Sequence, residues 1–298
     1  MVPLVDKKPQ KLIPFALILL QSLLYGFGDP ISKAAYERMP VCSLLAVRYF
    51  IAFAVLMLIA GKRVIRELRS LRSHAWIAPS VCIAVSYVLS NLALRLTAAT
   101  SVAFLRSLAT VMTPLLALLF FRKRYELRHA AIALASVVGL YLLCSFGGLS
   151  GFGPGEILSL LGALCMAGAL LLGEKALSQM GALTLTTVQA AASAVCAFLA
   201  ALIFEKGVHT EQATPQIWAV IVYLAIACTA AGYLLQNHAL RHIPARTVAL
   251  LQCACPVCTA VFSFLILRER LSAAGVIGAV IILTCVAAEI RVDSRNAE

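Results

Sequence analysis

SYVLSNLALR, residues 86–95, returns 146 positions later as GYLLQNHALR, residues 232–241, with six of ten positions identical. The register continues beyond this match without a gap, so that Thr113 aligns with Thr259. Shared hydrophobicity alone does not produce a constant offset across more than one apolar segment. The sequence therefore predicts an internal duplication that covers most of the chain.

The composition is that of a protein embedded in a membrane and excludes an ordinary soluble domain. Of the 298 residues, 62% are hydrophobic and 13% are charged, and the mean hydropathy is +0.94. The apolar segments are mostly near twenty residues long, which is the length that a helix needs to cross the hydrocarbon core. The ten predicted transmembrane helices are 12–29, 39–60, 74–94, 98–121, 128–146, 154–174, 182–204, 214–236, 245–267 and 272–290.

Each repeat holds five predicted helices, and this odd number determines the orientation of the second repeat, which must cross the membrane in the opposite direction. We predict an all-α membrane protein of two inverted five-helix repeats, residues 1–146 and 154–298, joined by the glycine-rich connector FGGLSGFGPG at 146–155. Inverted repeats recur in secondary transporters, whose ligand sites lie near the membrane midplane between the repeats.

The distribution of positive charge predicts how the chain sits in the membrane. The net charge is +12, and with a cytoplasmic N-terminus the inner segments hold 17 Lys and Arg against 6 in the outer loops. This bias follows the positive-inside rule and predicts a multi-pass protein of the cytoplasmic membrane with both termini in the cytoplasm. The partner that these charges fit is the lipid bilayer, and no nucleic-acid partner is expected.

Arg106 is the most conspicuous polar residue of the predicted helices, because it lies about 12 Å deep in the fourth one. Thr110 and Thr113 follow on the same helix face, and the duplication places Gln252 at the position equivalent to Arg106. Two equivalent polar stripes predict one cavity that both helices line. A buried guanidinium binds carboxylate or phosphate groups of a solute, or it pairs with Asp29, and the sequence leaves both alternatives open.

Further residues extend the predicted substrate site. Asp29 and Arg48 are predicted to act as a gate or an ion pair, and Pro30 in GFGDP is expected to break or kink the first helix. Aromatic contacts to the solute are expected from Phe27, Tyr87 and Tyr233.

Short motifs along nearly the whole chain resemble one transporter family. In the first half the matching residues are Gly26, Lys33, Pro40 and Arg48. In the second half they are YLLQNHAL, Pro256 and RERLSAAGVIGAVIIL, with Glu269, Arg270, Leu271 and Gly278. The chain resembles the EamA type of the drug/metabolite transporter superfamily, although Tyr25 stands where that family often has Trp and Lys123 where it often has Glu. The resemblance implies transport, mostly outward, of amino acids, other metabolites, cofactors or drugs. Because members with different substrates commonly have Arg at the position of Arg48, the resemblance also implies that Arg48 supports the fold more than it contacts the solute.

These features predict a secondary transporter, an exporter or exchanger, that moves a small metabolite by alternating access. A buried arginine favours an amino acid or another carboxylate-bearing solute. A passive channel is the alternative, and an intramembrane enzyme is a more distant one. The chain has no HExxH, GxSxG or P-loop motif, so it is expected not to be an enzyme, and no catalytic residue or cofactor is predicted.

Acidic residues, cysteines and small residues add three further expectations. Asp29, Glu156, Glu174 and Glu269 all lie near span ends, which favours uniport or exchange over proton antiport. Most of the ten cysteines lie in apolar spans, and CACPVC at 253–258 has no His or carboxylate beside it, so no metal site is predicted. Small-residue stripes suit helix packing within a monomer or in a homodimer.

Overall fold

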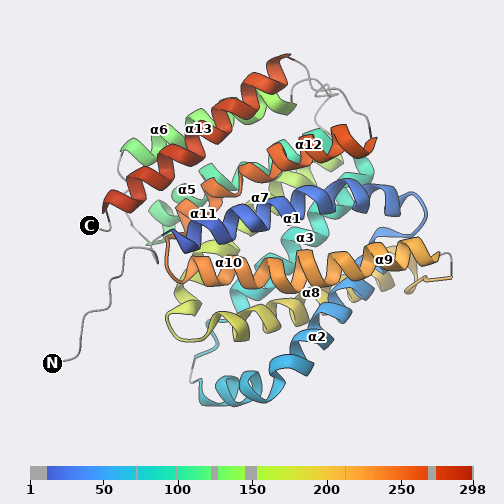
Figure 1. Ribbon diagram of the computed structural model, residues 1–298. Coiled ribbons are helices and arrows are strands. Elements are labelled where there is room, and N and C mark those ends of the chain that lie inside the picture. The colour runs from blue at the N-terminus through green and yellow to red at the C-terminus, as the bar shows by residue number, and fades with distance from the viewer. Residues whose placement is uncertain are drawn as a thin grey trace.

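The computed structural model describes residues 12–71, 73–97, 99–121, 127–144, 153–211, 213–267 and 273–296. Within these ranges every regular element is a helix (Figure 1). Several positions named above lie outside the described residues. They are the chain up to residue 11, Lys123, the connector at 145–152 and the segment 268–272 with Glu269, Arg270 and Leu271.

Every predicted span coincides with one or more helices, although α1 and α2 continue well beyond the predicted ends at 29 and 60. The first repeat contains α1 (Ile13–Tyr36), α2 (Val41–Ser70), α3 (Ile77–Leu96), α4 (Ala99–Ser107), α5 (Ala109–Phe121) and α6 (Leu127–Cys144). The second contains α7 (Pro154–Leu177), α8 (Ala182–Glu205), α9 (Pro215–Tyr223), the π-helix η3 (Leu224–Ala231), α10 (Gly232–Leu240), α11 (Ala245–Leu251), α12 (Ala254–Leu267) and α13 (Ala273–Asn296). In the described residues nine helical spans are long and apolar enough to cross a membrane. A shorter apolar helix, Arg128–Leu143, corresponds to the remaining predicted span, 128–146.

The first helix differs from its prediction, because α1 does not end at Asp29 but continues through Pro30 to Tyr36. A proline removes one backbone hydrogen bond, and neighbouring helices and hydroxyl side chains compensate for it inside membrane proteins. Here the Ser32 hydroxyl donates to the Gly28 carbonyl at 2.7 Å. The Tyr36 hydroxyl donates to an oxygen of Asn91 at 2.6 Å, which holds the last turn of α1 against α3.

Reciprocal glutamate contacts hold α2 and α8, the equivalent helices of the two repeats, antiparallel to each other. Glu67 near the end of α2 accepts a hydrogen bond from the Gly181 amide at the start of α8. Glu205 at the end of α8 accepts hydrogen bonds from the Cys42 and Ser43 amides at the start of α2, each at 2.8 Å. A helix N-terminus stabilises a carboxylate through its unpaired N–H groups and its dipole. An inverted repeat produces such matching contacts at the two ends of an antiparallel helix pair.

The last helices of the two repeats, α6 and α13, also lie side by side (Figure 1) and approach closely at two glycines. A Cβ atom on Gly139 would lie 3.0 Å from the Gly278 carbonyl oxygen. A Cβ atom on Gly278 would collide with the Gly139 carbonyl oxygen and with the backbone of Leu142 and Leu143. At Gly139, therefore, the small-residue stripe of α6 serves packing within one chain.

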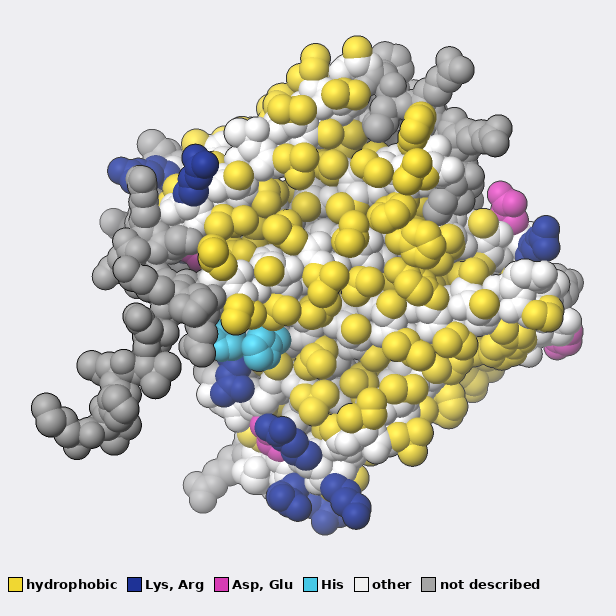
Figure 2. Space-filling model, in the orientation of Figure 1, with side chains coloured by type: hydrophobic (Ala, Val, Ile, Leu, Met, Phe, Trp, Pro, Cys, Tyr) yellow, Lys and Arg dark blue, Asp and Glu magenta, His cyan; other side chains and the backbone are white. Residues whose placement is uncertain are grey.

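The surface of the bundle is suited to lipid. Figure 2 shows hydrophobic side chains spread over most of the visible face, with Lys and Arg side chains at its margins. Leu58 and Phe120 are 86% and 75% exposed, a degree of exposure that water would penalise for such large apolar side chains. The apolar exterior and the spanning helices together identify a multi-pass membrane protein.

Gly278→Ala is expected to separate α6 from α13, because the new methyl group would meet backbone atoms that cannot rotate away. The expected loss of stability is about 1–3 kcal/mol, measured by unfolding of the purified protein. Gly168→Ala in α7 is the matched control, since its Cβ would make only a 3.7 Å contact with Cys82 Sγ. Equal stabilities for the two variants would contradict the close approach of α6 and α13.

Candidate functional site

Two spanning helices are interrupted at equivalent positions of the two repeats. The first break separates α4 from α5 at Leu108, and the second separates α11 from α12 at Gln252 and Cys253. The offset of 146 aligns Arg106 with Gln252, so each break carries one long polar side chain. Irregular backbone at membrane depth is tolerated where it is enclosed by protein or lines a cavity. Both breaks satisfy this condition.

The second break has a proline at its origin, and the first break contacts it. Pro256 has no N–H to bond to the Gln252 carbonyl, which instead accepts a hydrogen bond from the Cys255 amide at 2.9 Å. Thr110 occupies the equivalent of Pro256 in the first repeat. Its hydroxyl donates to the Ala249 carbonyl of α11 at 2.8 Å, which joins the two interrupted helices directly.

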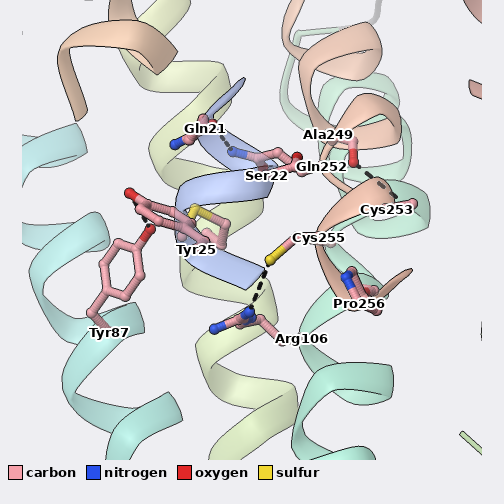
Figure 3. Close-up of a pocket in the computed structure, with 13 residues that line it drawn as sticks. Gln21, Ser22, Tyr25, Tyr87, Arg106, Ala249, Gln252, Cys253, Cys255 and Pro256 are labelled. Carbon is pink, nitrogen blue, oxygen red and sulfur yellow. Dashed lines mark hydrogen bonds between the residues drawn. The ribbon is translucent and has the colours of Figure 1, made fainter. Parts of the chain in front are cut away.

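A cavity of about 50 Å³ lies beside the two breaks (Figure 3). Arg106 and Gln252 line it from the breaks, Gln21 and Tyr25 line it from α1, and Tyr87 lines it from α3. A ligand the size of benzene needs a cavity of about 150 Å³, whereas this one holds only a few water molecules. The conformation is therefore closed around its polar centre.

Arg106 forms an ion pair with Asp29 beside this cavity. The distance from Nη2 to Oδ2 is 3.1 Å, and the two side chains are 19% and 28% exposed. Arg106 Nη2 also lies 3.7 Å from Cys255 Sγ, the contact drawn in Figure 3. The Thr259 hydroxyl donates to the same Asp29 oxygen at 3.2 Å. The structure thus contains the Asp29 pairing that the sequence left open, and it also exposes Arg106 to the cavity.

Three glutamine side chains bond to one another beside the cavity, and two of them, Gln21 and Gln252, line it. Gln21 donates to the side-chain oxygen of Gln236 in α10 at 3.0 Å. Gln252 donates to Gln236 at 2.8 Å and to Gln21 at 3.2 Å. An amide side chain has both donors and acceptors, so Gln21 and Gln252 can exchange their mutual hydrogen bonds for bonds to either kind of polar group on a solute.

A second cavity, of about 20 Å³, lies beyond Tyr25, Tyr87 and Arg106 and includes Asp29 and Arg48 in its lining. Tyr25, Tyr87 and Arg106 line both cavities. The Tyr87 hydroxyl donates to the Tyr25 hydroxyl at 3.1 Å, which closes the gap between α1 and α3. These three residues, which we call the partition, separate the two cavities.

Arg48 hydrogen-bonds to a hydroxyl, and in the described residues it forms no ion pair with Asp29. Its Nε donates to Thr229 Oγ1 at 2.8 Å, and its guanidinium lies 5.3 Å from the centre of the Tyr49 ring. Thr229 belongs to η3, where its own hydroxyl donates to the Leu224 carbonyl at 3.0 Å. A π-helical turn inside a longer helix frequently occurs at a functional site.

The other predicted contact residues lie outside both cavities. Thr110 and Thr113 are buried, and the Thr113 hydroxyl donates to the backbone of its own helix at 2.7 Å. Tyr233 is fully buried and stacks on Tyr87 with ring centres 5.6 Å apart. Phe27 packs edge-on against two other aromatic rings. Contact of these four residues with a solute stays a prediction.

The sequence analysis gave no role to Gln21 and used Tyr25 only as a departure from the family pattern. Gln21 has no polar counterpart, because the offset of 146 aligns it with Ala167. Looking only for charged residues and for polar residues that recur in both repeats therefore misses Gln21. Counting every amide and hydroxyl inside the apolar spans would have found both residues.

The cysteines near the site are buried and contact polar groups through their sulfur atoms. Cys253 is buried, with its sulfur 2.9 Å from the Thr110 hydroxyl, and Cys255 is buried beside Arg106. In the part of the chain that the structure describes, no group of three or more His, Cys, Asp or Glu residues is placed to hold a metal ion.

Both repeats match one family model, that of the EamA-like transporter family, over residues 12–145 and 153–288. The chain belongs to this family. The EamA-like chain is 25% identical over 274 residues to a protein of Archaeoglobus fulgidus described as an uncharacterized transporter, a match that covers 89% of this chain and 93% of the relative. A solved crystal structure of a protein shares the fold at 20% identity, with a TM-score of 0.77 over 98% of this chain and 100% of its own.

These findings make the chain a membrane transporter of small solutes, with the lipid bilayer as its surroundings. They agree with the two-repeat helical fold and with the polar centre enclosed between the repeats. The nature of the solute is a separate question, which the chemistry of the cavity addresses.

Asp29→Asn and Arg106→Gln are expected to be energetically coupled, because each change leaves the other side chain without its partner in a partly buried place. The expected coupling is about 1–2 kcal/mol, above that of a surface ion pair and below that of a fully buried one. Unfolding of the wild type, both single variants and the double variant measures it. Combining Asp29→Asn with a change at the exposed Arg241 should give additive effects, and equal coupling in both cycles would contradict a specific pair.

Proposed function

We propose that this EamA-like protein carries a small carboxylate-bearing solute, with an amino acid as the first candidate, by alternating access as an exporter or exchanger. The observation that supports this proposal is the position of Arg106, which lines the central cavity. In the described residues only its Nη2 has hydrogen-bond partners, so further N–H donors are left for a solute. A guanidinium binds a carboxylate through two parallel hydrogen bonds.

The ion pair itself favours a zwitterion. When an amino acid enters, its carboxylate binds Arg106 and its ammonium group binds Asp29, so that both protein charges exchange one partner for another. Neither charge is left without a counter-charge at membrane depth. An uncompensated charge there would cost several kcal/mol of free energy. The amides of Gln21 and Gln252 remain for other polar groups of the solute.

Alternating access fits the two cavities and the two breaks. The partition of Tyr25, Tyr87 and Arg106 stands between the cavities, so a solute crosses only when these side chains rearrange. The breaks at Leu108 and at Gln252 supply one bending point in each repeat. The central cavity is closed, so the repeats must separate to admit a solute, which is how carriers differ from open pores.

The charge distribution supports a direction for this scheme. With both termini in the cytoplasm, α1 runs outward, so that Gln21 lies on the inner side of Asp29. The larger cavity then faces the cytoplasm and the smaller one faces the outside of the cytoplasmic membrane. The site is built within a single chain, and a monomer or a homodimer is compatible with it.

Arg106→Gln is expected to weaken uptake of the solute into proteoliposomes by about 10–150-fold, the range expected for losing a hydrogen bond to a charged group. A thermal-shift screen of the purified protein against amino acids and other carboxylates identifies the solute, because a ligand stabilises the state that binds it. Radiolabelled uptake then compares the variants.

Arg106→Lys and Arg241→Gln are the controls for this measurement. Lysine keeps the charge but loses the paired geometry of the guanidinium, so intermediate uptake is expected. Arg241 is exposed at the end of α10, and its replacement should leave uptake unchanged. Unchanged affinity of the Arg106→Gln variant for the solute would remove Arg106 from the binding site.

Counterflow separates a carrier from the channel and enzyme alternatives. Proteoliposomes preloaded with unlabelled solute are expected to accumulate labelled solute transiently above its external concentration, because a carrier exchanges one molecule for another. A channel would let the labelled solute equilibrate without this overshoot. Chromatography of the recovered solute should show it chemically unchanged, and a converted product would indicate an enzyme.

A further inference from the structure

A buried histidine–glutamate pair lies apart from the central cavity, where α6 begins and α13 ends (Figure 1). His129 Nδ1 lies 2.9 Å from Glu289 Oε2 and 3.0 Å from Oε1. The two side chains are 5% and 1% exposed, so both titratable groups are withdrawn from water. Ionisable groups inside membrane spans are candidates for proton or ion pathways. The sequence argument against proton coupling did not consider Glu289.

The contacts of Glu289 fit an ionised carboxylate. The Thr247 hydroxyl donates to Glu289 Oε1 at 3.0 Å, so the carboxylate acts as an acceptor from two sides. A buried carboxylate needs a counter-charge, and the nearby Arg246 is paired with Asp293 at 3.6 Å. A protonated His129 is the neighbouring group that can supply this positive charge.

The ring atom Nε2 of His129 argues against a charged imidazolium, but the free-energy cost of leaving it unpaired is the smaller of two costs. Buried His129 Nε2 has no hydrogen-bond partner in the residues that the structure describes. An unpaired N–H costs less free energy than a carboxylate buried without a counter-charge. The charged pair is thus favoured, and the unpartnered Nε2 marks the atom that water can reach once the helices part.

Among the side chains that the structure describes, the remaining charged groups on the helices around the pair are exposed or already paired. Arg128 on α6 and Arg291 on α13 are exposed. Asp293 on α13 faces Arg246 on α11 and interacts electrostatically with both members of the pair. The described parts of α5 and α12 contain no charged residue, and the charge of α4 is Arg106, which is held by Asp29.

The short helix α11 connects this pair to the central cavity. Thr247 near its start bonds to Glu289, and Gln252 directly after its end lines the cavity. The two positions are five residues apart, about 7.5 Å along a helix. Between them the Ala249 carbonyl accepts the Thr110 hydroxyl of the other broken helix. A displacement of α11 at the Thr247–Glu289 contact therefore also moves Gln252 at the cavity, and the reverse holds as well.

We propose that His129 and Glu289 form the proton-binding site of the transport cycle and that α11 links this site to the solute site. In the closed conformation the pair holds one proton on the imidazole. When α11 moves, Thr247 leaves Glu289, water reaches the pair, and the proton passes from His129 to that water. The link to solute movement rests on the proposed function, whereas the proton site does not.

Nitrogen-15 NMR of histidine side chains in the full-length protein tests the proton site without any solute. Of the five histidines, His129 should give the signals of an imidazolium that is hydrogen-bonded to a carboxylate, and the exposed His209 is the reference for a solvated ring. His129→Asn removes the signal and keeps a side-chain donor at the Nδ1 position. If that variant does not fold, His→Gln changes at the other four histidines assign the signal by elimination. A neutral His129 at the pH of the transport assay would overturn the proposal.

A pH-sensitive dye inside proteoliposomes tests the coupling, with the solute that the uptake screen identifies. Solute flow through the wild type should change the internal pH, and His129→Asn should abolish this change. His209→Gln is the matched control and should leave both solute flow and the dye response intact. Solute flow without a dye response in the wild type would overturn the coupling, even if His129 is an imidazolium.

Thr247→Val separates the proton site from its link, because valine has nearly the same shape and no hydroxyl. The His129 signal should stay that of an imidazolium, while the protons moved per solute should fall at least about fivefold, the low end of coupling between sites. An unchanged ratio would show that α11 does not carry the link.

Discussion

A guanidinium inside an apolar helix bundle has to keep a counter-charge, and the arrangement of the centre follows from this requirement. Arg106 on α4 holds Asp29 on α1, and Thr259 on α12 binds the same carboxylate. The first helix must therefore approach α12 closely. Gly26 permits that approach, since any Cβ there would collide with Cys258. The cavity lies between these three helices, where Tyr87 and Gln252 complete its polar lining.

The repeat and the spans could be predicted because they depend on patterns that the chain carries by itself. Helix length follows from hydrophobic length, and the constant offset that joins Tyr87 to Tyr233 shows the duplication without any structure. The break at Gln252 was also foreseeable, because Pro256 removes a backbone donor. The break at Leu108 was not, since no proline stands at the equivalent position and contact with α11 maintains it.

The site was only partly predictable, because helix periodicity tells which residues share a face but not what that face contacts. Arg106, Thr110 and Thr113 follow one stripe, yet the stripe divides between the cavity and the neighbouring helices. Glu289 escaped notice for a related reason. It stands near the end of its span, where a carboxylate usually reaches water, and the packing of α6 and α11 encloses it.

The reciprocal contacts of Glu67 and Glu205 bear on how the chain matures during synthesis. As the ribosome delivers the first repeat to the bilayer, Glu67 has no N-terminus to stabilise it until the start of α8 is inserted. The N-terminus of α2 stays without its partner for longer, because Glu205 is the last residue of α8. The halves therefore cannot mature one after the other as independent units. A chain interrupted between them would present unmet polar groups to the quality-control machinery of the membrane.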